Sequence, residues 1–344
     1  MHIRSIRFYS LILPLTLALF VVSCKQDQEE SEQTYTQYEG PVFGTYYRIK
    51  IDSDNNFKPQ IDSVFQAINT AANSYVGASE ITSLNSTGKL ENPSPTFLSM
   101  IKQAQHFQQI TKGYFEPALY PLIKAWRFEQ GGATMQVDSL ELENLMSLLP
   151  MEESVMISDT LIKVKKEGTK IDLSAMGEGY AIEGIHQVLI DAGIENYMIE
   201  IGGEIFARGL NEKGKTWTIG IEDPSKAATN SYDNIITKVQ LSNQGISTSG
   251  SYRKFYTDDQ GNKYPHIINP KTGYPVQHHL VSVSIKAASP LVADTYATAC
   301  MAMGTEKAKA FIAADSDVEL FMAYYVKDSL KTWNSPNFYK IATQ

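Results

Sequence analysis

The sequence predicts an α+β fold with largely antiparallel sheets and flanking helices. Helix-like and strand-like segments do not alternate strictly, as they would in a doubly wound parallel sheet. Several strand-like segments follow one another through short turns, which favours antiparallel pairing. The 344 residues are 43% hydrophobic, which is enough for a substantial core. We see neither an internal repeat nor an inter-domain linker, and we expect one large domain or two intimately joined lobes.

The first residues have the pattern of a secretory signal. Arg4 and Arg7 precede an apolar run over residues 9–22, and a small residue stands before Cys24. The run is shorter than the roughly 20 residues of a membrane-spanning helix. It resembles a bacterial lipoprotein signal, which predicts a signal peptide at 1–23 and a lipidated Cys24. The alternative is a signal cut by the ordinary peptidase, in which the cysteine is incidental.

Residues 24–37 are predicted to be a flexible tether, because they are rich in Gln, Glu and Ser and have no apolar periodicity. The acidic cluster Asp27, Glu29 and Glu30 resembles the export signal of some surface lipoproteins of Bacteroidetes. We therefore expect a protein that is lipid-anchored to a bacterial cell-envelope membrane and faces the periplasm or the cell surface. Residues 38–344 are predicted to form the single folded domain.

Charge and cysteine content narrow the function classes. The formal net charge is −8, and it becomes −10 once Arg4 and Arg7 leave with the signal. An acidic chain without basic clusters argues against nucleic acid as a partner. With Cys24 lipidated, Cys300 is the remaining thiol, so no internal disulfide can form. Cys300 lies in an apolar helical stretch and is expected to be buried.

Hydrophobic periodicity predicts the individual elements. Helices are expected at 61–72, 98–110, 137–149, 290–303 and 306–314, and a turn followed by a helix is expected at 172–192. Strands are expected at 46–51, 154–158, 161–165, 196–201, 204–208, 217–221, 235–241, 245–249, 280–286 and 319–325. Residues 114–128 mix aromatic residues with two prolines, which favours an irregular wall of a pocket.

The segment 171–181, IDLSAMGEGYA, is the most informative short motif. Asp172 ends a strand, Ser174 has the chemistry of an N-cap, and Gly177 and Gly179 allow close approach. The free amides of a helix start attract anions. A carboxylate cannot face a phosphate directly, so either a metal mediates or Asp172 binds another part of the ligand. A nucleotide site, with or without Mg²⁺, and a purely structural junction are both consistent with the motif.

Two further groups carry polar chemistry. The segment 247–252, STSGSY, offers hydroxyl donors, and the turn 266–275, HIINPKTGYP, would hold His266 and Tyr274 in fixed places. Asp294 and Thr298 are four residues apart on one helix face, and such an oxygen pair suits Mg²⁺. The structural alternatives are an ordinary buried histidine and an aspartate that only charges the helix start.

Together these segments resemble the ApbE family of FAD:protein FMN transferases, which are periplasmic lipoproteins. The matching segments span nearly all of the mature chain in order. They are Phe43-Gly44-Thr45, residues 74–81 (SYVGASEI), 113–117 (GYFEP), 172–175 (DLSA), 202–204 (GGE), 247–250 (STSG), 266–275 and 294–299 (DTYATA).

The resemblance implies FAD in a cleft between two lobes, with Mg²⁺ at its pyrophosphate. The implied metal ligands are the Ala175 carbonyl, Asp294 and Thr298. The implied FAD contacts are Phe43, Tyr75, Ala118, Leu119, Tyr120, Asp172, Glu178, His266 and Ile267.

Several positions depart from the family pattern. Phe43 stands where Met is common, Val76-Gly77 where Asp-Pro is common, and Glu116 where Asp is common. Glu178 replaces a frequent Lys, and a carboxylate cannot donate a hydrogen bond to phosphate. We therefore expect Glu178 to bond the ribose or the adenine.

The implied reaction is attack of an acceptor Ser or Thr hydroxyl on the FMN-side phosphorus of FAD, with release of AMP. His266 is the expected proton acceptor, because its ordinary pKa suits neutral pH, and Asp172 or Asp294 are the alternatives. The implied partners are flavoprotein subunits of sodium-translocating NADH:quinone reductase and related electron-transfer complexes.

Three other functions share parts of this pattern. With water as the nucleophile, the same site would be an FAD pyrophosphatase that yields FMN and AMP. A non-catalytic flavin-binding lipoprotein would not require a metal-binding oxygen pair. A solute-binding lipoprotein of another kind would explain the signal and none of the internal motifs.

Overall fold

The computed structural model describes residues 35–126, 137–226, 234–252, 255–257, 263–265 and 267–341. All of them belong to one compact unit, Glu32–Gln344. The predicted signal peptide, residues 1–23, and Cys24 lie outside the described residues. Within the described part of the chain, no helix is both long and apolar enough to cross a membrane.

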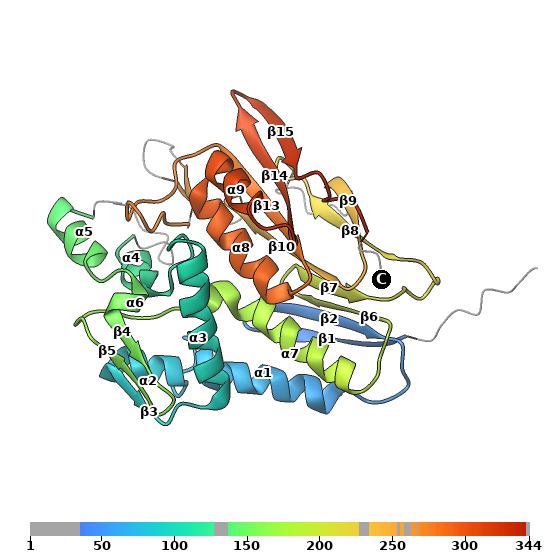
Figure 1. Ribbon diagram of the computed structural model, residues 1–344, viewed down its shortest axis with the longest axis horizontal. Coiled ribbons are helices and arrows are strands. Elements are labelled where there is room, and N and C mark those ends of the chain that lie inside the picture. Colours follow the sequence, from blue (N-terminus) through green and yellow to red (C-terminus); the bar gives the residue numbers. More distant parts are fainter. Residues whose placement is uncertain are drawn as a thin grey trace, which may run out of the picture. The chain divides into compact units, whose positions relative to one another are not determined.

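An eight-stranded sheet forms the centre of the fold (Figure 1), and each strand in it is antiparallel to its neighbours. In spatial order the strands are β1 (Thr36–Val42), β2 (Thr45–Ile51), β6 (Tyr197–Ile201), β7 (Glu204–Arg208), β10 (Gln244–Gly250), β13 (Leu280–Ala287), β14 (Val318–Val326) and β15 (Ser329–Asn334). The antiparallel α+β architecture predicted from the sequence is confirmed.

Strand β1 corrects the predicted end of the tether. Thr36 pairs with Ile51 and Gln37 with Lys50 of β2, so the last two residues assigned to the tether belong to the sheet. The strand alternates part-buried and exposed residues because one of its faces is open to solvent, and its sequence is therefore largely polar. The hairpin closes through Phe43 and Gly44, both with positive φ, as a tight two-residue turn requires.

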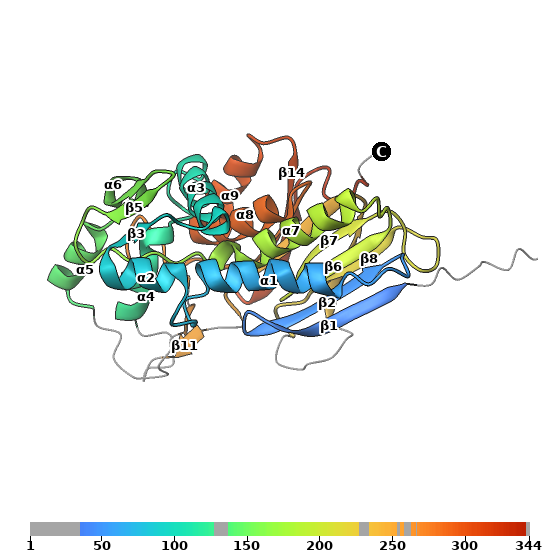
Figure 2. The same ribbon diagram turned by 90° about the horizontal axis from the view of Figure 1, so that it is seen from below.

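Helices cover one face of this sheet. They are α1 (Lys58–Ala72), α7 (Gly177–Asp191), α8 (Pro290–Met303) and α9 (Thr305–Ile312). Helix α8 packs on β10 and β13, α7 on β6 and β7, and α1 against α7, and Figures 1 and 2 show these three helices side by side. In α7, Ile182, Ile185 and Leu189 are fully buried, so their three- and four-residue spacing forms the stripe that faces the core.

The opposite face carries a second, smaller core. The hairpin of β8 (Trp217–Glu222) and β9 (Ile235–Leu241) contributes Trp217, Val239 and Leu241 to it. Phe321 of β14 and Phe338 complete the cluster. The central strands of the large sheet are therefore covered by helices on one side and by this hairpin with Phe338 on the other.

The described residues between 80 and 164 form a second group of elements, on the left in Figure 1. Its three-stranded sheet has the order β3-β5-β4. The strands are β3 (Lys89–Glu91), β4 (Val155–Ile157) and β5 (Leu161–Val164), and the helices are α2 (Glu80–Thr87), α3 (Pro95–Ile110), η1 (Pro117–Leu119), α4 (Tyr120–Ala125), α5 (Ser139–Met146) and α6 (Met151–Ser154). The strands β11 (Phe255–Thr257) and β12 (Lys263–Pro265) form a separate hairpin.

The region 114–128 was predicted to be irregular, and this prediction is wrong for residues 117–125. Pro117 is the first residue of η1, and Pro121 is the second residue of α4. At these positions the missing N–H of proline costs no helical hydrogen bond. Pro117 and Pro121 therefore begin helices here. Residues 127 and 128 lie outside the described residues.

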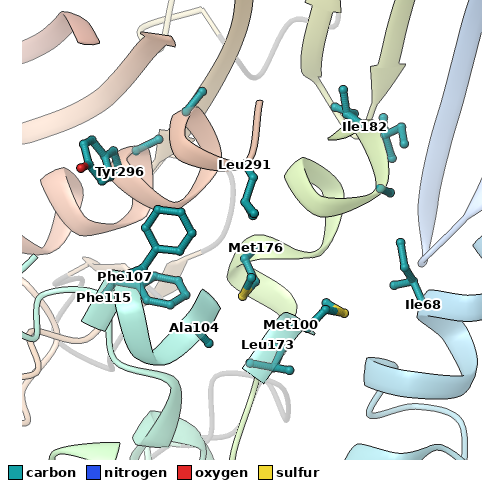
Figure 3. Close-up of a cluster of buried hydrophobic side chains, with 14 of the residues drawn as sticks. Ile68, Met100, Ala104, Phe107, Phe115, Leu173, Met176, Ile182, Leu291 and Tyr296 are labelled. Carbon is teal, nitrogen blue, oxygen red and sulfur yellow. The ribbon is translucent and has the colours of Figure 1, made fainter. Parts of the chain in front are cut away.

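One continuous core joins the two groups of elements (Figure 3). Phe107 of α3 makes an edge-to-face contact with Tyr296 of α8, with ring centroids 6.3 Å apart, and a second one with Phe115. Leu173 and Met176 are buried in the same cluster. The prediction of two intimately joined lobes agrees with this shared core.

Candidate functional site

The motif 171–176 is held in place by contacts to two distant segments. The Ile171 N–H donates to the Asn85 side chain (2.7 Å), and the Asn85 amide donates back to the Ile171 carbonyl (2.8 Å). The Asp172 N–H donates to the Pro117 carbonyl at 2.9 Å. This bond brings Asp172 next to the predicted FAD-contacting residues 118–120, which are 52 to 54 positions earlier in the sequence.

Ser174 was predicted to cap the helix, and the structure contradicts this. The N-cap residue of η2 (Ser174–Met176) is Leu173 and that of α7 is Met176, and neither of these two residues caps its helix with its own side chain. Instead Asp172 Oδ1 accepts the Ser174 N–H at 2.8 Å. The carboxylate supplies the acceptor because the chain turns at Asp172, two residues before the first helical residue. Ser174 and Ala175 are both exposed.

Asp294 is buried where α7 meets α8. Its Oδ2 accepts the Gly179 N–H at 2.9 Å, and the helix start of α8 is capped by Ser289 instead. A Cβ at position 179 would lie 2.7 Å from Asp294 Cβ and 2.9 Å from the Pro290 carbonyl oxygen. Glycine is therefore required at 179 for this contact, whereas a Cβ at Gly177 would meet no atom within 4 Å.

The surroundings of Asp294 are acidic. Burial raises the pKa of the Asp294 carboxyl well above its usual range, Glu204 and then Glu178 raise it further, and the Gly179 N–H works in the opposite direction. Glu178 lies in the first turn of α7, and Glu204 is the first residue of β7, directly after the Gly202-Gly203 turn. Each ionised carboxylate disfavours ionisation of the next, so a bound cation would stabilise the ionised form of Asp294.

Thr298 shares helix α8 with Asp294, and Ala175 lies on a neighbouring element. Thr298 follows one helical turn after Asp294, and its hydroxyl lies 3.4 Å from the Ser249 hydroxyl of β10. The short helix η2, which contains Ala175, packs against α8. A carboxylate, a hydroxyl and a backbone carbonyl are hard oxygen donors of the kind that Mg²⁺ takes. Among the described residues, no three His, Cys, Asp or Glu side chains are grouped to hold a metal. The predicted ligand set contains a single side chain of these types, Asp294.

The predicted FAD contacts lie on several elements. Phe43 packs its ring edge-to-face on Phe65 of α1, with centroids 5.6 Å apart. Tyr75 lies in the turn after α1 and is 85% exposed. Ala118 is buried, and Leu119 and Tyr120 are half-buried. The predicted catalytic residue His266 lies outside the described residues.

Glu116 fixes the segment 118–120 from inside the protein. Its Oε1 accepts the N–H groups of Ala118 (3.1 Å) and Met151 (3.0 Å), and its Oε2 accepts the Gln108 side-chain amide (3.2 Å). Burial raises the pKa of Glu116, and these hydrogen bonds lower it. The sequence showed Glu116 as a mild departure from the family, and its buried bonds give it the role of a structural anchor.

A model of the ApbE family matches residues 43–322 of this chain. The chain belongs to the ApbE family. A relative from Vibrio cholerae serotype O1 is 31% identical over 337 residues, which cover 95% of this chain and 97% of the relative. One from Escherichia coli K12 is 29% identical over 339 residues, covering 94% and 95%. Both relatives are named FAD:protein FMN transferase.

Solved structures of ApbE proteins have the same fold. The flavin transferase ApbE from Vibrio cholerae superposes with a TM-score of 0.74 at 29% identity, covering 89% of this chain and 98% of that structure. The flavinyl transferase ApbE from Pseudomonas stutzeri gives a TM-score of 0.78 at 22% identity, which compares the fold alone. The family resemblance read from the motifs is confirmed.

Sequence reasoning missed one acidic member of the Asp294 surroundings. Glu204 was quoted within the ApbE-like segment GGE and was given no role in the site. A Cβ at Gly202, which has a φ of 66°, would lie 3.1 Å from Glu204 Oε2 and 3.5 Å from Glu178 Cγ. The two glycines before Glu204 were the available signal, because a tight turn there directs the following residue toward the helix start.

Proposed function

We propose that this protein is a FAD:protein FMN transferase. It takes FMN from FAD and attaches it to a flavoprotein. The observation that carries the proposal is that the chain belongs to the ApbE family over residues 43–322. The packing of η2, which contains Ala175, against α8, which contains Asp294 and Thr298, supports it. Relatives aligned over almost their whole length are named for this activity.

We further propose that the reaction requires Mg²⁺, held by Asp294, Thr298 and the Ala175 carbonyl. The fit rests on the oxygen chemistry of these donors and on the acidic surroundings of Asp294. Bound there, the ion would neutralise negative charge on the FAD pyrophosphate, which is most of what phosphoryl-type transfer needs. The Gly179 N–H orients the Asp294 carboxylate by occupying one side of Oδ2.

The chain's own residues would bind and align the two reactants. An acceptor Ser or Thr oxygen forms a bond to the FMN-side phosphorus, the bond from this phosphorus to the bridging pyrophosphate oxygen breaks, and AMP leaves. We propose that His266 takes the proton of the hydroxyl. Asp294 is less suited to that task, because it is buried and its Oδ2 already accepts the Gly179 N–H.

Glu178 lies near other carboxylates, whereas a residue that hydrogen-bonds a nucleotide was expected at this position. It contributes negative charge beside Asp294, which favours cation binding over direct contact with phosphate. We propose that it strengthens the attraction for Mg²⁺, and a hydrogen bond to the FAD ribose or adenine is compatible with this role.

We also propose that Cys24 is lipidated, that the protein is anchored to a cell-envelope membrane, and that the acceptor is a flavoprotein subunit of a respiratory electron-transfer complex. The support is the signal-like N-terminus and the acceptors typical of the family. Mass spectrometry of the full chain from a membrane fraction should find acyl groups on Cys24. A Cys24→Ala protein that stays in the same fraction would contradict the anchor.

The test incubates the chain from Glu32 to Gln344 with FAD, Mg²⁺ and a candidate acceptor subunit. Mass spectrometry should then find an FMN adduct on a Ser or Thr of the acceptor and an equal amount of AMP. AMP without an adduct would favour the FAD pyrophosphatase. Neither product, with FAD still bound, would favour a flavin carrier.

A further inference from the structure

The turn 268–275 is attached to helix α4 by one buried tryptophan. Trp126, at the end of α4, is 5% exposed and donates its indole N–H to the Gly273 carbonyl at 2.7 Å. Its ring also contacts the ring of Tyr274, with centroids 5.5 Å apart. These contacts join residues 147 positions apart in the sequence.

Helix α5 packs against Gly273 of the same turn. Gly273 has a φ of 72°, and a Cβ there would lie 2.6 Å from Leu142 Cδ1 and 2.7 Å from Met146 Sδ. Trp126, Leu142, Leu122 and Ile268 form a buried cluster separate from the main core. The turn, α4 and α5 therefore pack as one unit.

A second contact ties the turn to the start of this unit. The Lys271 ammonium lies 5.6 Å from the centre of the Tyr114 ring, and its charge lowers the pKa of Glu116 against the effect of burial. Glu116 in turn holds the Ala118 N–H. The turn is thus fixed to the polypeptide on both sides of residues 118–120.

The unit carries predicted FAD contacts at two places. Residues 118–120 lead directly into α4, and Ile267 immediately precedes the turn, where its carbonyl accepts the Val276 N–H at 3.0 Å. A ligand that touches both segments binds more tightly when they are already fixed relative to each other, since less ordering is needed on binding.

We propose that Trp126 is a positioning residue for FAD, because its indole N–H fixes the turn of Ile267 relative to residues 118–120. The inference rests on the proposed function and adds to it a residue that touches neither the metal ligands nor the reacting atoms. Without the indole N–H, the buried Gly273 carbonyl lacks this donor, and the turn can separate from α4.

The test compares Trp126→Phe with Trp217→Phe. Trp217 is a matched control, because it is also 5% exposed and its indole N–H also donates to a backbone carbonyl, that of Arg208 at 3.2 Å. FAD binding is measured by calorimetry in the presence of Mg²⁺, and FMN transfer is measured as a function of FAD concentration.

For Trp126→Phe we expect the FAD Kd and KM to rise about tenfold, the effect of losing roughly 1.4 kcal/mol. The kcat at saturating FAD should stay within about twofold, and Trp217→Phe should bind FAD as the unaltered protein does. A merely structural role would lower thermal stability in both variants and would not separate KM from kcat.

Equal FAD affinity in Trp126→Phe and the unaltered protein, or equal weakening by both variants, would overturn the inference. If Trp126→Phe does not fold, Tyr274→Ala is the second variant, because it removes the ring contact at a position that is 44% exposed. It should also raise the FAD Kd. An unchanged Kd in Tyr274→Ala would likewise overturn the inference. Failure of the unaltered protein to bind FAD or transfer FMN would instead count against the proposed function.

Discussion

At the scale of single residues, Asp294 is the most constrained side chain of the site. It is buried beside two other carboxylates, and the described group that favours its ionisation is one backbone N–H. Burying a charge in such surroundings is costly unless a cation accompanies it. The position of Asp294 is therefore poorly explained by stability alone, which supports the proposed metal binding.

We predict that Asp294→Asn lowers FMN transfer by at least about a hundredfold, since a bound metal contributes several kcal/mol to such reactions. Mg²⁺ should no longer raise the melting temperature of this variant in the presence of FAD. Stability without Mg²⁺ should not fall, because Asn removes a buried charge and keeps an acceptor for Gly179. Asp191→Asn, at an exposed position on α7, is the control. Full activity in Asp294→Asn would exclude the metal assignment.

The two glycines of the motif should respond differently to alanine. Gly179→Ala places a methyl group 2.7 Å from Asp294 Cβ and should destabilise the protein by about 1–3 kcal/mol, as overpacking does. Gly177→Ala enters open space at a helical φ of −67° and should be neutral or stabilising by up to about 1 kcal/mol. Urea unfolding measures both changes. Equal effects of the two substitutions would mean that the α7–α8 contact is looser than described.

His186 predicts how stability depends on pH. Burial and then Arg208 lower its pKa from 6.5 to about 4, and its Nδ1 lies 2.6 Å from the Tyr197 hydroxyl. The unfolded chain therefore binds a proton at a higher pH than the folded protein does. The contribution of His186 to stability is complete above about pH 6.5 and declines as the pH falls toward 4.

In His186→Gln we expect a smaller loss of stability between pH 7 and pH 4.5 than in the unaltered protein. The urea midpoint at each pH is the measurement, and the comparison cancels groups that titrate in both proteins. Parallel pH profiles would show that His186 is not protonated over this range on unfolding.

At the scale of elements, the hairpin of β1 and β2 sets where the folded protein begins. A chain that starts at residue 38 loses the pairs of Thr36 with Ile51 and Gln37 with Lys50. We predict that it is less stable than one starting at Glu32 by about 1–2 kcal/mol, since a backbone hydrogen bond contributes about 1 kcal/mol. Thermal unfolding of the two chains decides this, and identical curves would mean that these pairs are frayed.

Elements with one solvent-exposed face were the hardest to predict. For most long apolar patterns, the predicted helix or strand begins and ends close to the observed one. For example, the predicted helix 290–303 has the same bounds as α8. The prediction omitted β1 and β15, because both lie at the edges of the large sheet and expose polar residues. It also treated Pro117 and Pro121 as helix breakers, although a proline in the first turn is compatible with a helix.

At the scale of the whole molecule, one core joins the elements that carry the site. Phe107, Met176 and Tyr296 belong to three separate parts of the chain and share it (Figure 3). The η2 segment, α7 and α8 are therefore positioned by a large packed volume, and a small set of polar bonds at Asp172 and Asp294 sets the final geometry. Rigid support of this kind is what a site for a charged transition state needs.

The sequence by itself determined the antiparallel α+β class, through periodicity within single elements, and the family, through the order of its motifs. The resemblance to that family then named the full set of proposed ligands. The tertiary structure alone decided that Gly179 supports Asp294, that Glu178 and Glu204 lie near that carboxylate, and that Trp126 holds the turn at Gly273. The Gly179 and Trp126 bonds join residues 115 and 147 positions apart. Contacts at such separations come from packing between elements, and the pattern of one element carries no record of the side chains that another brings against it.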